Sequence, residues 1–302
     1  MNNSRQDAAE FIYRVSWPAR GMRPGAHTSR HAGMGQLFSR YASLVDYPDP
    51  RRLDLRASVR DPFGMLYTRV YRQRTAISVI VVADLSSSMR FGDKRQFVAD
   101  LVAAGARSAL SSGDAFGFIG IGQGQSEGHS QGHSHRRGQG PGPADSLYLP
   151  PSFRQGAAEW LLRRLAEPLP VGRTLSDEAA MAGRLPARRS LLFLVSDFHW
   201  PAPRLEQMLG LLSRHDVVPV VLWDPHEYDA LPRRGLVSLA DPETGRRRTL
   251  FMRPKLAERW RAAYAERRTL LTRRFHRNGR PPLFAGVRFA ATTFTDYFLR
   301  AA

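Results

Sequence analysis

From residue 76 onwards, short apolar runs alternate with stretches of helical periodicity. The first run, Ile77–Ala83, is β-branched and lacks polar alternation, which is typical of a strand buried on both faces. Three further runs are strand candidates: Phe116–Ile121, Ser190–Val195 and Val217–Trp223. Helical spacing of apolar residues recurs between and after them, in Asp93–Ser111, Phe153–Leu165 and Arg204–Ser213. This alternation predicts an α/β fold with a doubly wound, mainly parallel sheet covered on both faces.

Residues 1–75 differ in composition from the rest of the chain. They are rich in Arg, Pro, Gly and Tyr, with turn signals such as Asp61–Gly64. Met65–Tyr71 alternates in the manner of a half-exposed strand. We therefore expect an irregular, partly β N-terminal extension over residues 1–75 and an α/β domain over residues 76–302.

A segment rich in Gly, Gln and His, residues 122–143, interrupts the predicted domain. It has no apolar side chain and is expected to be a disordered loop inserted between two elements. Its histidines, His129, His133 and His135, are capable of chelating a transition metal. A flexible loop fixes no ligand geometry, so incidental binding is the simpler interpretation.

The C-terminal part of the chain contains a long, Arg-rich helical pattern over Pro254–Arg277. Pro254 suits a helix start and Gly279 a helix end. An apolar stripe on this helix is expected to face the core, and its Arg residues to face solvent; the stripe consists of Leu256, Trp260, Tyr264 and Leu271. A last short strand over Val287–Ala290 and a helix over Thr293–Arg300 complete the predicted elements.

Composition narrows the class of protein. The chain has 302 residues, 42% hydrophobic, which is enough for a sizeable core. It contains no cysteine, so disulfides, thiolate catalysis and cysteine-bound zinc are excluded. No apolar run approaches the roughly 20 residues that cross a bilayer, and Met1–Asp7 lacks the apolar stretch of a secretory signal. These features predict a cytoplasmic protein without a membrane span.

The chain is strongly basic. Lys and Arg number 45 against 27 Asp and Glu, a formal net charge of +18, and Lys94 and Lys255 are the only lysines. Such an excess favours polyanions or acidic protein partners through long-range attraction. The charge is concentrated at Arg246–Arg248 and along the helix that follows.

The segment Asp84–Ser88 carries the main candidate chemistry. It directly follows the first buried strand and offers one carboxylate, Asp84, and two hydroxyls at alternate positions, Ser86 and Ser88. In open α/β sheets, ligands bind at the carboxyl edge of the strands. Oxygen donors with little charge suit Mg²⁺ or Mn²⁺. The plainer alternative is a polar strand end whose side chains cap the following turn.

Two further oxygen donors are expected at the same edge. Asp197 follows the strand Ser190–Val195, and Thr174 lies in a turn after Gly172 that precedes a helix. Together Asp84, Ser86, Ser88, Thr174 and Asp197 form a nearly neutral, oxygen-only set. These ligands are too few to saturate an octahedral cation, so waters or an outside carboxylate must complete the coordination.

These three segments, in this order, resemble the metal-ion-dependent adhesion site of von Willebrand factor A domains. The resemblance narrows to the bacterial family called domain of unknown function 58. That family shares a Tyr and Asp-x-Arg-x-(Ile/Leu)-Asp block, seen here as Tyr47–Asp54, and late blocks seen here at Arg214–Glu227 and Asp241–Glu243. The matching blocks extend over most of residues 30–245.

The resemblance implies a docking point without catalytic activity. Ser86, Ser88 and Thr174 would offer hydroxyls to Mg²⁺ or Mn²⁺, Asp84 and Asp197 would hold the ion largely through water, and an acidic partner side chain would complete the shell. Arg173 and His199 are expected at the partner-binding rim. The family's typical partner is a MoxR-type AAA+ ATPase, with which it is thought to assist the assembly of client proteins.

Two other classes of function, a hydrolase and a nucleic-acid-binding protein, are alternatives to this interpretation. A phosphatase of the haloacid dehalogenase type would use Asp84 as nucleophile but requires a second Asp at position 86, where this chain has Ser86. A Ser-His-Asp hydrolase would require glycines around Ser87. A nucleic-acid-binding protein would use the Arg-rich helix Pro254–Arg277, although no known nucleic-acid motif is present.

Overall fold

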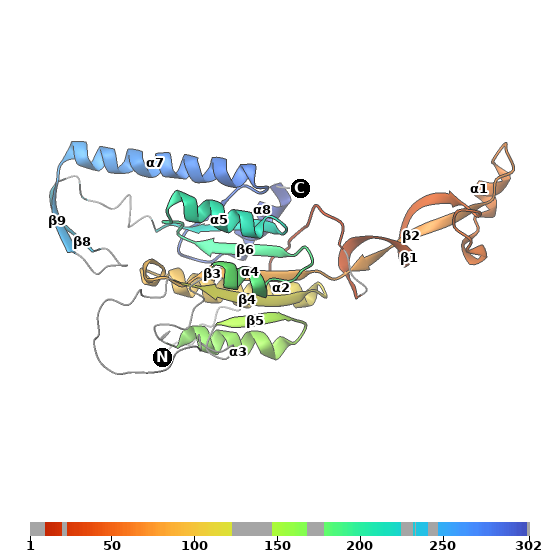
Figure 1. Cartoon of the computed structure of the whole chain (residues 1–302), viewed down its shortest axis with the longest axis horizontal. Coiled ribbons are helices and arrows are strands. Elements are labelled where there is room, and N and C mark those ends of the chain that lie inside the picture. The colour runs from red at the N-terminus through yellow and green to blue at the C-terminus, as the bar shows by residue number, and fades with distance from the viewer. Residues whose placement is uncertain are drawn as a thin grey trace. The chain divides into compact units, whose positions relative to one another are not determined.

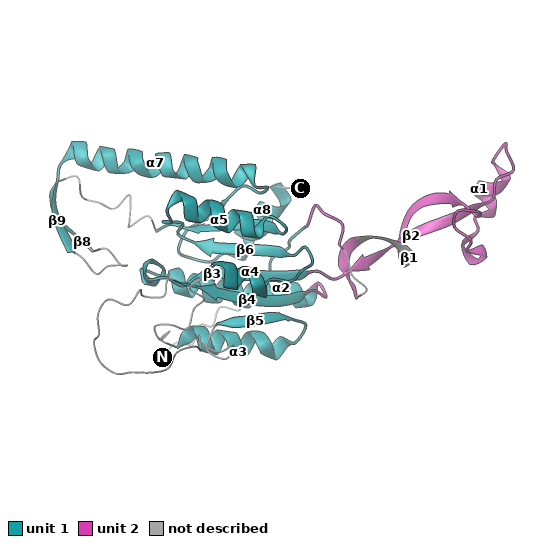
Figure 2. Cartoon of the chain, in the orientation of Figure 1, with its two compact units in different colours: residues 1–14, 78–111, 115–302 teal, residues 15–77, 112–114 magenta. Residues whose placement is uncertain are grey.

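The computed structural model describes residues 10–19, 23–122, 147–167, 178–224, 232, 234–240 and 247–300, with the side chains of 29–36 and 239–240 left out. The chain forms two compact units, coloured separately in Figure 2. The larger unit contains residues 1–14, 78–111 and 115–302, and the smaller contains residues 15–77 and 112–114. The segment just before residue 15 therefore packs with the larger unit, not with the rest of the predicted extension.

The larger unit is built on a six-stranded sheet formed by β3 (Ser78–Asp84), β4 (Ala115–Ile121), β5 (Tyr148–Ser152), β6 (Leu191–Ser196), β7 (Asp216–Leu222) and β10 (Leu283–Ala285). The strand order is β10-β7-β6-β3-β4-β5. Figure 1 labels its central and lower part, β6-β3-β4-β5. All neighbouring pairs are parallel except β4 with β5. β3 is central, and helices cover both faces of the sheet, so its side chains are buried from Val79 to Asp84.

Helices cover both faces of this sheet. They are α2 (Lys94–Ser111), α3 (Gln155–Ala166), α4 (Glu178–Arg184), α5 (Ala202–Leu212), α7 (Pro254–Arg277) and α8 (Ala291–Arg300). One face packs on apolar residues of α4, α5 and α7, including Met181, Met208 and Phe275. On the other face, Phe193 of β6 contacts Phe294 and Phe298 of α8. The predicted doubly wound α/β fold is confirmed.

The smaller unit contains the antiparallel pair β1 (Pro24–Ser43) and β2 (Tyr67–Thr75). Between them lie the 3₁₀ helix η1 (Pro50–Arg52) and the short helix α1 (Leu55–Val59). Asp54 organises this connection: it is buried, its Oδ1 caps α1 by accepting from the Ala57 amide at 3.1 Å, and its Oδ2 accepts from Arg69 Nε at 2.6 Å.

Several elements differ from the sequence expectations, and β5 is among those not predicted. The last strand is β10, Leu283–Ala285, and the predicted strand Val287–Ala290 is wrong, because the earlier segment is the one that pairs with β7. An antiparallel hairpin of β8 (Gly235–Ala240) and β9 (Arg247–Met252) precedes α7 and was not predicted. Most of the predicted disordered insertion, residues 123–143, lies outside the described residues.

Among the described residues, no helix is both long and apolar enough to span a membrane.

Candidate functional site

Asp84 lies at the carboxyl end of the central strand β3 and is 2% exposed. Several hydrogen bonds fix its carboxylate. Oδ1 accepts from the Ser86 amide at 3.0 Å, and Oδ2 accepts from Ser196 Oγ at 2.8 Å and from Trp200 Nε1 at 2.9 Å. Because β6 runs beside β3 in parallel register, Ser196 ends its strand at the same edge of the sheet. The carboxylate is therefore held in one orientation.

Ser86 and Ser88 follow directly. Ser86 precedes the 3₁₀ helix η2 (Ser87–Arg90), which turns the chain so that the two alternate hydroxyls face each other. Their Oγ atoms are 3.2 Å apart, and the Ser88 hydroxyl is hydrogen-bonded to the carboxylate of Asp197. The two hydroxyls of the predicted motif thus converge on both carboxylates.

Asp197 follows the last residue of β6 and is 1% exposed. The next residue, Phe198, has a φ of 51°, a left-handed conformation that non-glycine residues rarely adopt. This turn lets the His199 amide donate to Asp197 Oδ1 at 3.3 Å and places His199 Nδ1 3.2 Å from the same oxygen. The His199 side chain is 41% exposed, so it lies where the site meets solvent.

Lys94, the first residue of α2, also reaches the site. Its Nζ lies 3.2 Å from Asp197 Oδ2 and 3.5 Å from the Ser88 carbonyl oxygen. Its side chain and that of Asp197 are each 1% exposed, so this is a fully buried ion pair. Sequence reasoning missed Lys94. The available signal was that it is one of only two lysines in an Arg-rich chain and closely follows the Asp-Ser-Ser motif.

The two carboxyl groups have opposite pKa shifts. Burial raises the pKa of Asp84, and hydrogen bonds from Ser86 and Ser196 oppose this shift without cancelling it. Burial also raises the pKa of Asp197, but the hydrogen bond and charge of His199 and the charge of Lys94 outweigh it. The pKa of Asp197 therefore lies well below its usual range, and Asp197 is the firmly ionised member of the pair.

Residues from α7 and β7 support the turn after β6. Arg267 of α7 donates to the carbonyls of Phe198 and Trp200, the latter at 3.4 Å. Trp223, just after β7, donates from Nε1 to the Asp197 carbonyl at 2.9 Å and packs against Tyr264 of α7 with the two rings tilted by 45°. The expectation that the Arg residues of this helix face solvent is therefore wrong for Arg267, because buried carbonyls of the turn require a donor.

The structure brings together four of the five predicted metal ligands, namely Asp84, Ser86, Ser88 and Asp197. Thr174 and the predicted rim residue Arg173 lie outside the described residues. Within the described part of the chain, no three His, Cys, Asp or Glu side chains cluster in a way that could hold a metal. The predicted metal ligands of the candidate site that the structure describes are two carboxylates and two hydroxyls.

The donor set fits a small hard cation. In octahedral magnesium coordination, adjacent oxygens lie about 3 Å apart. Ser86 Oγ and Ser88 Oγ are hydrogen-bonded to each other at 3.2 Å, so the two hydroxyls are near enough to share one ion. Both oxygens of Asp84 already accept hydrogen bonds, which suits a carboxylate that holds the ion through water.

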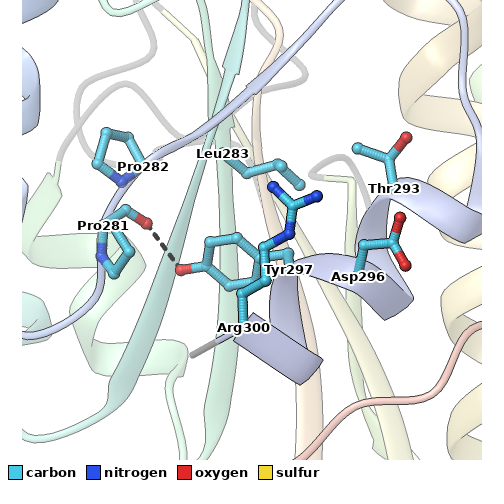
Figure 3. Close-up of a pocket in the computed structure, with 7 residues that line it drawn as sticks. All are labelled: Pro281, Pro282, Leu283, Thr293, Asp296, Tyr297 and Arg300. Atoms are coloured by element: carbon cyan, nitrogen blue, oxygen red, sulfur yellow. Dashed lines mark hydrogen bonds between the residues drawn. The ribbon is translucent and has the colours of Figure 1, made fainter. Parts of the chain in front are cut away.

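A separate open pocket of about 320 Å³ lies between α8 and the segment leading into β10 (Figure 3). Tyr297 lines it and donates from its hydroxyl to the Pro281 carbonyl at 2.7 Å. Asp296 and Arg300 of α8 also line it. None of the predicted site residues contributes to this pocket, so it is distinct from the candidate metal site.

Fold and site together define an α/β protein with a polar, oxygen-rich site at the carboxyl edge of a mainly parallel sheet. Residues 142–270 match the family described as "Protein of unknown function DUF58". The chain is also 38% identical over 103 residues to the "Uncharacterized protein in moxR 3'region" of Paracoccus denitrificans, covering 34% of this chain and 98% of that protein. The chain belongs to this DUF58 family.

Among solved structures, the chain is similar to the "conserved hypothetical protein BatB from Bacteroides thetaiotaomicron". The sequence identity is 11%, and the TM-score is 0.37 over 75% of this chain and 98% of that chain.

Proposed function

We propose that this protein is a non-enzymatic, metal-dependent protein-binding module. One observation carries the proposal: the hydroxyls of Ser86 and Ser88 lie 3.2 Å apart beside two buried carboxylates at the carboxyl edge of the sheet. That edge is where open α/β sheets bind ligands. The set is rich in oxygen and low in charge, which suits Mg²⁺ or Mn²⁺.

In this proposal Ser86 and Ser88 would hold the ion directly, and Asp84 and Asp197 would hold it largely through water, with Thr174 as a further hydroxyl. The bound ion supplies an electrophilic centre that accepts a carboxylate from an acidic partner. Ser196 and Trp200 keep the Asp84 carboxylate oriented, so the site needs little rearrangement before the partner arrives.

The proposed partner is a MoxR-type AAA+ ATPase, with which the protein would assist the assembly or maturation of client proteins. The relative from Paracoccus denitrificans is named for its position in the moxR 3' region, and this position supports the pairing. The formal net charge of +18 supports an acidic partner because unlike charges accelerate encounter.

The absence of catalysis is part of the proposal. A phosphatase nucleophile needs an accessible carboxylate oxygen, whereas Asp84 is 2% exposed and accepts hydrogen bonds at both oxygens. Position 86 holds a serine, which is a poor general acid. Metal-dependent hydrolysis of a generic phosphate ester that disappears in Asp84→Asn would show the proposal to be wrong on this point.

Direct metal binding tests the proposal. Isothermal titration of the whole chain with Mn²⁺ is expected to show one site that is lost in Asp84→Asn combined with Ser86→Ala. Asp296→Asn with Ser213→Ala removes the same chemical groups from exposed positions of the same unit and is expected to bind Mn²⁺ like the wild type. Circular dichroism confirms that both variants fold.

A pulldown from native cells extends the test to the partner. The wild type and the control variant are expected to capture the ATPase in a manner that EDTA abolishes. If the Asp84→Asn, Ser86→Ala variant captures the same ATPase equally well, the metal-dependent docking mechanism is wrong.

A further inference from the structure

The ammonium group of Lys94 lies inside the candidate metal site. It is 3.2 Å from Asp197 Oδ2, and both side chains are 1% exposed. The same Nζ is 3.5 Å from the Ser88 carbonyl oxygen, on the residue whose hydroxyl also bonds to Asp197. A positive charge is thus placed on one of the carboxylates that the proposed ion would use.

Burying an ammonium group costs free energy unless the charge is paired and hydrogen-bonded. The buried position of the Lys94 ammonium group therefore differs from that of an ordinary lysine on the protein surface. Lys94 and Lys255 are the only lysines among 45 basic residues. An ammonium is a compact point charge on a flexible stem, whereas a guanidinium is planar and larger. Lysine is therefore the basic side chain that best takes the place of a small ion at Asp197.

We propose that Lys94 is a tethered cation that competes with a divalent ion for Asp197 and makes the site depend on an acidic partner. This inference rests on the proposed metal-docking function. Lys94 withdraws from Asp197 towards the Ser88 carbonyl when the divalent ion binds, because two cations on one carboxylate repel each other.

The net charge of the site explains why Lys94 would make binding of the ion depend on a carboxylate. When both carboxyl groups are ionised, Asp84 and Asp197 contribute −2 and Lys94 contributes +1, so the site carries −1 without a divalent ion. With Mg²⁺ or Mn²⁺ it carries +1, and an incoming carboxylate brings it to zero. Without the lysine, the two aspartates alone would neutralise the ion, and no excess charge would attract the partner. Lys94 therefore weakens binding of the ion alone and makes that binding depend more strongly on an incoming carboxylate.

Mn²⁺ titration of Lys94→Met tests the competition. Methionine keeps an unbranched chain of similar length and removes the charge. The variant is expected to bind Mn²⁺ alone about tenfold or more tightly than the wild type, since a nearby like charge is removed. Acetate stands in for the carboxylate of the partner. Replacing chloride by acetate at constant ionic strength should therefore tighten Mn²⁺ binding to the wild type, and it should tighten binding to the variant by a smaller factor. Lys255→Met, which changes the only other lysine at an exposed position, is the matched control.

A second measurement needs no mutation. With lysine labelled by ¹⁵N at Nζ, the spectrum contains signals from two side chains only, because the chain has two lysines. Adding Mg²⁺ is expected to shift the Lys94 signal and leave that of Lys255 in place. This keeps the inference testable if Lys94→Met fails to fold.

The outcomes separate this inference from the proposed function. If Lys94→Met binds Mn²⁺ no more tightly than the wild type, and Asp84→Asn still abolishes binding, the competition is refuted and the metal site stands. If only Lys94→Met binds Mn²⁺, and the wild type binds none even in acetate, the competition is supported and the metal-dependent function of the natural chain is refuted. If neither binds, both fail. An unmoved Lys94 signal under saturating Mg²⁺ also overturns the competition.

Discussion

Trp200 Nε1 donates a 2.9 Å hydrogen bond to Asp84 Oδ2, joining the turn after β6 to the end of the central strand β3. The indole is 8% exposed and the carboxylate 2%, so the bond is shielded from water. Sequence reasoning did not find this partner, although Trp200 lies three residues beyond Asp197. The bond shows that the two strand ends form one hydrogen-bonded unit.

Trp200→Phe removes this donor and leaves a buried carboxylate oxygen with one partner fewer. The expected cost is about 1–3 kcal/mol in the free energy of unfolding, measured by urea denaturation. Trp160→Phe is the control, because Trp160 lies on α3 and is 44% exposed. An equal loss in both variants would contradict the special role of the Trp200 bond.

Arg267→Met is expected to loosen the turn that carries Asp197 and His199. The guanidinium donates to the carbonyls of Phe198 and Trp200, which the shorter, uncharged side chain leaves without this donor. Mn²⁺ affinity should fall several-fold while the secondary structure is retained. Arg273→Met on the exposed surface of the same helix serves for comparison. Unchanged affinity in Arg267→Met would show that α7 does not support the site.

His215 makes stability depend on pH. It lies just before β7 and is 8% exposed, and its Nδ1 has no hydrogen-bond partner among the described residues. Burial, with the positive charges of Arg214 and Arg189, lowers the pKa of His215 below its ordinary value of 6.5. The unfolded chain therefore binds a proton at this residue more readily than the folded chain.

The free energy of unfolding therefore falls as the pH is lowered through this range. The contribution of neutral His215 is fully present above pH 6.5 and is lost as the pH falls from 6.5 towards the lowered folded-state pKa. Chemical denaturation at a series of pH values should show a shallower slope in this range for His215→Gln than for the wild type. His276→Gln, at an exposed position on α7, should keep the wild-type slope.

Asp54 is expected to control local order in the smaller unit. It caps α1 and accepts from Arg69, and the cap hydrogen bond to Ala57 and the bond from Arg69 lower its pKa. In Asp54→Ala, amide hydrogens of Leu55–Val59 should exchange faster while those of β3 keep their protection. Asp46→Ala, at an exposed site in the same unit, should leave both unchanged. Equal protection of α1 in both variants would refute the capping role.

The nucleic-acid alternative has a test of its own. Arg267 bonds to backbone carbonyls and Arg274 pairs with Glu206 at 3.3 Å, so part of the basic charge of α7 is used within the fold. We expect no binding to a defined DNA duplex with the steep salt dependence of phosphate contacts. Such binding, lost when exposed Arg residues of α7 are replaced, would favour the alternative.

The fold was predictable where a local pattern carries the signal. Central strands of a parallel sheet are buried on both faces and must be apolar throughout, so β3 and β6 stand out in the sequence. The edge strand β10 does not stand out in the sequence, because a strand of three residues is recognisable only by its pairing with β7. The hairpin β8–β9 was missed for the same reason, because its strands, too, are defined by their pairing.

The sequence by itself determined the ends of the buried strands and hence the positions of Asp84, Ser86, Ser88 and Asp197 at one edge of the sheet. Only the tertiary structure decided what those groups contact. Lys94 meets Asp197 across 103 positions of sequence, and Trp200 meets Asp84 across 116. The physical reason is that the burial of a strand is recognisable from its own apolar residues. The partner of a buried charge, in contrast, depends on which distant helix or turn is packed over it.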